Sequence, residues 1–276
     1  MRFPRLISKL YFEPLLLSAT ARMSLESAFQ NYLAGSLPDP EALSQKPAMS
    51  ERTADIYEQF GNVVVIRIDG VIDKHISQLD MLCYGGVDLD DVESALACAE
   101  ADSAVGTIVL AINSPGGSVT GVPECAASIA RIKAGGKDVI AFTDSQCCSA
   151  AYWIASAANE VIVSESAVVG SIGVYVALLD QSKAMEMQGL KVELVKAGAF
   201  KAAGAPFKEL SSDERAMFQA RVDDIYSQFC TAVCSGRGEI ATESMQGQVF
   251  SAKDAIANGL ADQVINSLDE LVSSLM

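Results

Sequence analysis

Residues 106–118 read Gly-Thr-Ile-Val-Leu-Ala-Ile-Asn-Ser-Pro-Gly-Gly-Ser, and this stretch indicates the fold class. Gly106–Ile112 is a run of apolar and β-branched residues, which predicts a buried strand. Asn113–Gly117 then supplies turn residues, and Val119–Ala134 has the apolar spacing of a helix. A buried strand that leads through a turn into a helix is the repeating unit of α/β proteins.

The same alternation extends in both directions from this stretch. The sequence predicts further strands at Asn62–Ile68, Asp138–Phe142, Val161–Val163 and Val192–Lys196. It predicts further helices at Leu89–Ala101, Ser149–Ala158, Ser182–Gln188, Ser211–Cys234, Ala252–Asn258 and Leu268–Leu275. Because strands that alternate with helices usually pair in parallel, we expect an α/β fold with largely parallel sheets.

The N-terminal residues have a different character. Ser24–Leu33 has the spacing of one amphipathic helix, and residues 36–47 are rich in Pro, Ser and Asp, as linkers are. We therefore divide the chain into an N-terminal arm and linker at residues 1–55 and one domain at residues 56–276. A domain of that length can bury a large core.

The composition limits the classes of partner. Apolar residues make up 50% of the 276 residues, which is enough for a packed core. The formal net charge of −15 disfavours binding to the phosphates of nucleic acids and to anionic membrane surfaces. No apolar run approaches the roughly 20 residues that span a bilayer. We expect neither nucleic acid nor a membrane as a partner.

Cysteine and histidine usage restricts the chemistry. The chain has seven cysteines, an odd number, with no Cys-x-x-Cys pair, so we expect reduced thiols and a cytosolic compartment. The single histidine, His75, lies beside Lys74 in a polar stretch, which is typical of a surface residue. A zinc site is therefore disfavoured. A serine hydrolase built from this sequence would need another base, and an unprotonated amine can serve.

Ser149 is the first candidate for that chemistry. It begins the predicted helix at residues 149–158 and is followed by the small residues Ala150 and Ala151. N–H groups at the start of a helix suit an oxyanion, and small neighbours leave room for an acyl group. The alternative is that Ser149 is a plain N-cap of an alanine-rich helix.

The turn at Ser114–Ser118 is the second candidate. Its Gly116 and Gly117 can adopt positive φ, which lets a main-chain N–H face a ligand and suits an oxyanion hole. No Gly-Lys-Ser/Thr follows, so this is not a phosphate-binding Walker loop. The alternative is an ordinary turn between a strand and a helix.

Lys201 is the third candidate. It lies among Ala, Gly and Phe, and no carboxylate occurs within seven residues on either side. Such surroundings disfavour the charged ammonium if the side chain is buried, which would favour a role as a base. The alternative is a solvated loop lysine.

Together these segments resemble the signal peptide peptidase A family of serine–lysine proteases. The family has four motifs in a fixed order: a glycine loop, a serine with small and aromatic residues, a Gly-Ser-Ile/Leu-Gly-Val strand, and a Gly-x-x-Lys turn. Here they are Asn113–Gly117, Ser149–Trp153, Gly170–Val174 and Gly198–Lys201. The resemblance covers roughly residues 60–270, and 52 residues separate the serine from the lysine.

Within that family the chain looks most like the tailed-phage head-maturation (protein C type) branch. Cys148 before the serine and the N-terminal Phe12–Leu17 are both similar to that branch. Two departures exist. Ala150 and Ala151 stand where the family often has glycines. That branch commonly continues into a scaffold-like tail, whereas the sequence here stops at Met276, so the scaffold is either a separate protein or a tail that this sequence does not include.

The resemblance implies a role for each residue of a Ser–Lys dyad. Ser149 would be the nucleophile and Lys201 the general base. The main-chain N–H groups of Gly117 and Ala150 would form the oxyanion hole, and Gly116 would shape its loop.

Two further assignments stay open in the sequence. Ser171 matches a family serine that would hold the lysine amine, but it could also be a turn serine at a strand end. Tyr152 and Trp153 are expected in the core rather than against substrate.

The resemblance also implies a ClpP/crotonase-like fold of stacked β-β-α units, no cofactor and no metal. The family tends to form homo-oligomeric rings, in which the dyad could join two subunits. The leading hypothesis is an endopeptidase that cleaves scaffold, portal or capsid proteins inside the assembling phage prohead in the host cytoplasm. The alternatives are a cellular signal-peptide-fragment peptidase and a non-catalytic scaffold module.

Overall fold

The computed structural model describes residues 11, 13–17, 26, 49–76 and 85–276. Its largest sheet has six strands among these residues. In spatial order they are β13 (Gln263–Val264), β10 (Glu160–Val163), β8 (Asp138–Thr143), β6 (Thr107–Asn113), β3 (Val63–Asp69) and β2 (Tyr57–Phe60). Only β2 runs antiparallel to its neighbour. This confirms the predicted α/β class with largely parallel pairing.

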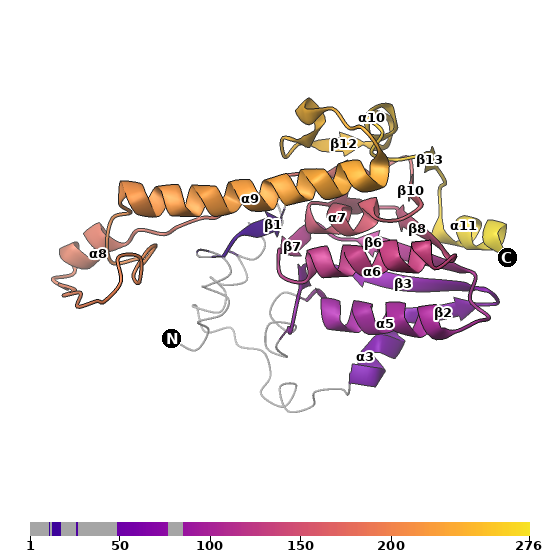
Figure 1. The fold of residues 1–276 in the computed structure, drawn as a ribbon, viewed down its shortest axis with the longest axis horizontal. Helices are drawn as coiled ribbons and strands as arrows, with labels where there is room; N and C mark the ends of the chain where they lie inside the picture. The colour runs from indigo at the N-terminus through magenta and orange to yellow at the C-terminus, as the bar shows by residue number, and fades with distance from the viewer. Residues whose placement is uncertain (1–10, 12, 18–25, 27–48, 77–84) are drawn as a thin grey trace.

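Helices cover both faces of this sheet (Figure 1). Helices α5 (Leu89–Ala101), α6 (Val122–Ala134) and α7 (Ala150–Ser156) lie on one face, and α11 (Leu268–Leu275) lies on the other. Successive residues of a strand point to opposite faces. Accordingly, Val64 belongs to the core beneath α5–α7, and Val65 belongs to the smaller core beneath α11.

Two smaller sheets continue from the large one. The first has the order β1 (Leu15–Leu17), β7 (Gly116–Ser118), β4 (Ile72–Asp73) and β5 (Val87–Asp88). The second has the order β12 (Val249–Ser251), β11 (Val168–Gly170) and β9 (Gln146–Cys148). Along the chain, β6 is followed by β7 and α6, and β8 by β9 and α7. The chain therefore repeats a β-β-α unit, which places the ends of β7 and β9 side by side.

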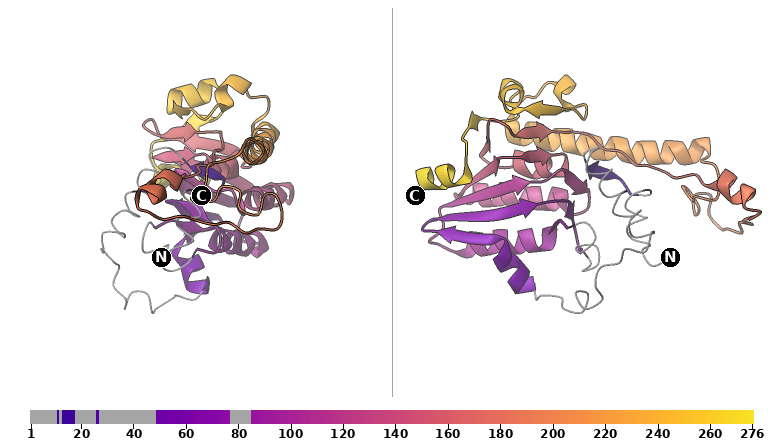
Figure 2. Two further views of the ribbon diagram at one scale, coloured as in Figure 1. Left: turned by 90° about the vertical axis from the view of Figure 1, so that its left-hand side faces the viewer. Right: turned by 180° about the vertical axis from the view of Figure 1, so that it is seen from behind.

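A long helix extends beyond the body of the molecule. Helix α9 (Ser212–Arg237) packs its second half on α7, where Phe229 stacks on Trp153 with ring centroids 4.8 Å apart. Its first half leads away from the body toward α8 (Ser182–Met187), as Figures 1 and 2 show. We call residues 181–211 the projection.

The start of α9 is anchored within the projection. Ser211 accepts a hydrogen bond from the Glu214 N–H while the Glu214 carboxylate accepts one from the Ser211 N–H, which together form a capping box. Lys208 Nζ also lies 2.5 Å from the buried Glu214 carboxylate. The hydrogen bond from Lys208 lowers the pKa of Glu214 below its ordinary value.

The remaining described elements are short. They are α3 (Met49–Asp55), the 3₁₀ turn η1 (Thr242–Met245) and α10 (Ala252–Ala257). No helix in the described part of the chain has the length and apolarity needed to cross a bilayer.

Most predicted elements are confirmed, and one is wrong. Helices α5 and α11 begin and end at the predicted residues. The strand predicted at Val192–Lys196 does not form: these residues have no regular structure and are exposed. An alternating pattern makes a strand only where a neighbouring strand can accept its hydrogen bonds, and this segment lies in the projection, away from the sheets (Figure 1).

The N-terminal residues are described only in part. The predicted helix at Ser24–Leu33 and the linker at residues 36–47 lie outside the described residues. The division at residues 55 and 56 stays a prediction. Leu15–Leu17 belongs to the predicted N-terminal arm, yet it forms a buried strand, β1, paired with β7 of the domain.

Candidate active site

The backbone at Ser149 is in an unusual conformation. Ser149 links β9 to α7 and has φ 59° and ψ −119°. These are the angles of the first central residue of a type II′ turn, a position that favours glycine. Holding a serine there costs about 1–3 kcal/mol, and such strain is concentrated at functional sites. A plain N-cap with extended backbone would need no such strain.

The glycine turn is held against Ser149 by main-chain hydrogen bonds. The Ser114 N–H donates to the Gln146 carbonyl at 2.8 Å, and the Cys148 N–H donates to the Ser114 carbonyl at 3.1 Å. The Ser114 hydroxyl is buried and accepts from the Gly116 N–H at 3.2 Å. The turn after β6 and the end of β9 are thus fixed to each other. The sequence alone indicates no separate role for Ser114.

Only glycine fits at the two positions beside the serine. A Cβ on Gly116, which has φ 101°, would lie 2.8 Å from Ser149 Cβ and 3.0 Å from the Cys148 carbonyl oxygen. A Cβ on Gly117 would lie 1.7 Å from the Ile72 carbonyl oxygen. Because both clashes involve backbone or the serine itself, β7 must be bare backbone next to Ser149.

A second segment touches the serine backbone. The Ser149 N–H donates to the Gly170 carbonyl at 2.7 Å, at the end of β11. Ser171 follows with φ 53°, and its N–H donates to the Gln248 carbonyl at 2.7 Å. The strand of the Gly170–Val174 motif ends at Gly170 rather than continuing through Val174. Ser171 therefore lies in the body of the molecule, one residue from a direct contact of Ser149.

The helix behind the serine is fixed by its aromatic residues. Tyr152 is fully buried and its hydroxyl donates to the Leu260 carbonyl at 2.8 Å. Trp153 is buried against Phe229 of α9. Both residues are core residues, as predicted. They hold α7, and with it the Ala150 N–H, in place.

Lys201 is not part of this cluster. It lies in the projection, in a turn where its N–H donates to the Gly198 carbonyl at 3.3 Å, and it is exposed. The strand that the sequence predicts shortly before it, at Val192–Lys196, does not form, so no sheet positions Lys201. Within one chain, Ser149, Gly117, Ala150 and Ser171 thus belong to or directly follow the body elements β7, β9, α7 and β11, whereas Lys201 belongs to the projection. Figure 1 shows the projection leading away from these elements.

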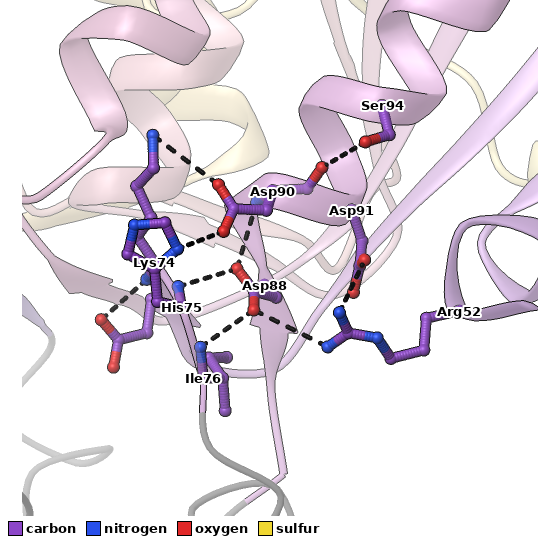
Figure 3. A network of polar contacts seen from close by, with 9 residues as sticks. Arg52, Lys74, His75, Ile76, Asp88, Asp90, Asp91 and Ser94 are labelled. Carbon is purple, nitrogen blue, oxygen red and sulfur yellow. Dashed lines mark hydrogen bonds and ion pairs between the residues drawn. The ribbon is translucent and has the colours of Figure 1, made fainter. Parts of the chain in front are cut away.

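His75 belongs to a polar network around β4 and β5 (Figure 3). Its side chain is 71% exposed, as predicted for a surface residue, and its ring contacts Asp90. Its backbone N–H donates to the Asp88 carboxylate at 3.0 Å, and Arg52 faces Asp88 and Asp91 at 3.8 and 3.4 Å. This network fixes the turn after β4, which is a neighbour of β7.

The thiols beside Ser149 are protonated. Cys147 and Cys148 are buried, and burial raises the pKa of the Cys148 thiol to about 12. Burial and the neighbouring Cys148 raise the pKa of Cys147 well above its ordinary value. Because the thiolate is the reactive form of cysteine, neither thiol is suited to act as the nucleophile.

We expect iodoacetamide at about pH 8 to leave Cys147 and Cys148 unmodified, because a raised pKa keeps both thiols protonated and burial excludes the reagent. The exposed Cys98 should react in the same sample and serves as the internal control. Peptide mass mapping measures both. Rapid alkylation of Cys148 in the folded protein would contradict this assignment.

Comparison with known proteins relates this chain to peptidases. The profile of peptidase family S49 matches residues 131–276, more than half of the chain. Capsid assembly protease C of Escherichia phage lambda is 29% identical over 286 residues, which cover 97% of this chain and 64% of that protein. Head-tail preconnector protein GP5 of Enterobacteria phage P21 is 29% identical over 281 residues, which cover 96% and 56%. The chain thus spans less than two thirds of either relative.

The fold also has a counterpart among solved structures. The 1510-N membrane-bound stomatin-specific protease superposes with a TM-score of 0.52 over 78% of this chain and 85% of that chain, at 14% identity. At that identity the likeness concerns the fold alone. It confirms the predicted ClpP/crotonase-like architecture.

Proposed function

The chain belongs to peptidase family S49, and from this premise we propose that it is a serine endopeptidase whose nucleophile is Ser149. The observation that supports this most directly is the strained backbone of Ser149 at the junction of β9 and α7. A side chain held in that way projects from a sharp turn with a fixed direction, which a nucleophile needs and an ordinary cap does not.

The neighbouring backbone suits the rest of an acyl-transfer site. Gly117 follows Gly116, which lies against Ser149, and the Ala150 N–H belongs to the first turn of α7, where N–H groups have no partner within the helix. The main-chain N–H groups at these two positions would stabilise the oxyanion of a tetrahedral intermediate. Ser149 Oγ would attack the peptide carbonyl, the scissile C–N bond would break, and the amine would leave with the proton taken from Oγ.

We assign the general base to Lys201 of a neighbouring copy. The projection carries Lys201 and a series of exposed apolar side chains, which monomers rarely leave in solvent. They are Met187, Leu190, Val192, Leu194, Val195 and Phe200. If each projection docks on the next body, the contact is head-to-tail, and such contacts form a ring when the rotation from copy to copy closes. In that arrangement Ser171 of the receiving body could hold the incoming amine.

The substrates that fit this assignment are proteins of a phage head. The two phage relatives have names that place them in capsid assembly and at the head–tail connection. We propose that this chain likewise cleaves scaffold, portal or capsid proteins within a prohead, with no cofactor and no metal. Its net charge of −15 agrees with substrates other than nucleic acid.

An active-site label tests this function. An alkyl fluorophosphonate should phosphonylate Ser149, located by peptide mass mapping, and only in the oligomeric fraction from size-exclusion chromatography, because the base comes from the neighbour. The labelled protein should no longer cleave purified scaffold protein. Labelling of another serine, or cleavage that continues after complete labelling of Ser149, would contradict the proposal.

A further inference from the structure

Strand β1 pairs with β7, the strand that contains the proposed oxyanion donor Gly117. Leu15–Leu17 pairs antiparallel with β7, so that Leu16 faces Gly117 and Leu17 faces Gly116. On its other side β7 contacts β4 through Ile72 and Gly117. Without β1, β7 would be an edge strand with unpaired backbone groups beside Ser149, which is the kind of edge that binds an extended peptide.

Strand β1 is bound on its other side as well. The Leu15 N–H donates to the Tyr175 carbonyl at 2.8 Å, and the Tyr175 N–H donates to the Leu15 carbonyl at 3.2 Å. Tyr175 lies five residues after Gly170, whose carbonyl accepts from the Ser149 N–H. We call the space that holds β1 the slot: β7 lies on one side of it and Tyr175 on the other. The first side contacts Ser149 through Gly116, and the second belongs to the segment whose Gly170 carbonyl accepts from the Ser149 N–H.

The strand passes close to the nucleophile. The position that a Cβ on Gly116 would take is 2.2 Å from the Leu16 carbonyl oxygen and 2.8 Å from Ser149 Cβ. The three leucines are buried, with exposed fractions of 4%, 0% and 4%, and Pro14 before them is buried too. The slot thus accepts an extended apolar segment through its backbone and encloses the side chains.

We propose that β1 is an intramolecular occupant of the peptide-binding slot, which an extended apolar substrate segment must displace before Ser149 can act on it. This inference rests on the proposed peptidase function. A second strand cannot pair with the same edge of β7 while β1 is there. A three-residue strand is short enough to be exchanged, because strands of this length are rarely stable alone.

The substrate class follows from what the slot holds. The occupant has no charged side chain at its three paired positions, and all three side chains are leucine. A substrate that replaces it would present several consecutive apolar residues in extended conformation, antiparallel to β7. Charged residues in that stretch would be excluded by the cost of burial without a partner.

The first test compares a peptide-based label with a small label in the full-length chain. In the double variant Leu15→Asp/Leu17→Asp, β1 should leave the slot because its carboxylates would be buried. An acetyl-Leu-Leu-Leu diphenyl phosphonate should then inactivate Ser149 about tenfold faster or more, since the open fraction of the slot sets the apparent affinity. A small alkyl fluorophosphonate, which needs no strand pairing, should change much less.

The matched control is Met276→Asp, which adds a carboxylate at an exposed position away from β1. It should leave both rates as in the wild type. A folded Leu15→Asp/Leu17→Asp variant that reacts with the peptide label no faster than the control would overturn the inference. If neither label reacts in any variant, the peptidase function is wrong, while the second test still decides the occupancy of the slot.

The second test needs neither catalysis nor a destabilised strand. In full-length Ser149→Ala, saturating acetyl-Glu-Pro-Leu-Leu-Leu-Ser-amide should speed amide hydrogen exchange at Leu15, because the peptide takes its place. The Tyr175 amide should stay protected, because the peptide accepts its hydrogen bond. Unchanged exchange at Leu15, either with bound peptide or because no peptide binds, would show that β1 is a permanent part of the fold.

Discussion

Ser149→Ala should abolish peptidase activity, with a loss of about a thousandfold or more, and leave the protein folded. Alanine keeps the Cβ that packs against Gly116, so the turn between β9 and α7 changes only by one oxygen atom. The remaining oxyanion donors cannot replace a nucleophile that forms the acyl-enzyme. The measurement is cleavage of purified scaffold protein, with circular dichroism and melting temperature as folding controls.

The matched control for this variant is Ser145→Ala. Ser145 lies in the loop just before β9 and is exposed, so its hydroxyl can be removed without a change at the junction with α7. It should keep wild-type turnover. If Ser149→Ala is folded and still turns over substrate like Ser145→Ala, Ser149 is not the nucleophile.

Lys201→Arg should be nearly as inactive as Lys201→Ala. Arginine keeps the charge and much of the length of lysine, but it stays protonated at any working pH and cannot accept the serine proton. The control is Lys196→Arg, in the same exposed segment, where Nζ donates to the Ala199 carbonyl at 2.5 Å. Substantial activity in Lys201→Arg would show that Lys201 contributes only its positive charge and is not the general base.

Mixing two inactive variants tests whether the dyad joins two copies. Ser149→Ala supplies Lys201, and Lys201→Ala supplies Ser149. In rings that assemble at random from an equal mixture, about a quarter of the head-to-tail contacts should pair both intact residues and recover that share of the activity. A dyad within one chain predicts no recovery, so mixed rings without activity would contradict the intersubunit base.

The sequence predicts the long elements of this fold well, because their signals are local. Helix α11 begins after Ser267, which accepts a hydrogen bond from the Glu270 N–H, and its apolar side chains recur at helical spacing. Helix α9 carries its own capping box at Ser211 and Glu214. Such caps and periodicity lie within the segment itself, so they indicate a helix before its neighbours are known.

The short strands could not be predicted, because their partners determine them. Strand β7 is Gly-Gly-Ser, residues of low strand propensity, and β9 is Gln-Cys-Cys. Both form because β6 and β8 deliver them to the same edge. Conversely, residues 192–196 have a strand-like pattern without a partner. The pairing of Leu15–Leu17 with β7 joins residues about a hundred positions apart, and no local pattern indicates it.

The candidate site, like the fold, has features that the local sequence predicts and features that only tertiary contacts determine. Residue types and order along the chain were enough to single out Ser149, the glycine turn and Lys201. The positive φ of Ser149, the anchoring by Ser114 and the exposure of Lys201 depend on tertiary contacts that a sequence does not reveal. The roles of these residues remain predictions until the variants are measured.

Because Lys201 lies in the exposed projection, the activity of this chain should depend on its own concentration. If the base must come from a neighbour, the rate per molecule depends on how many copies meet, and a dilute pool of newly made chains would be harmless to host proteins. Confinement within a small shell would raise the local concentration and turn on every site at nearly the same time. The start of cleavage would then be set by the local concentration of the chain, with no need for a separate activator.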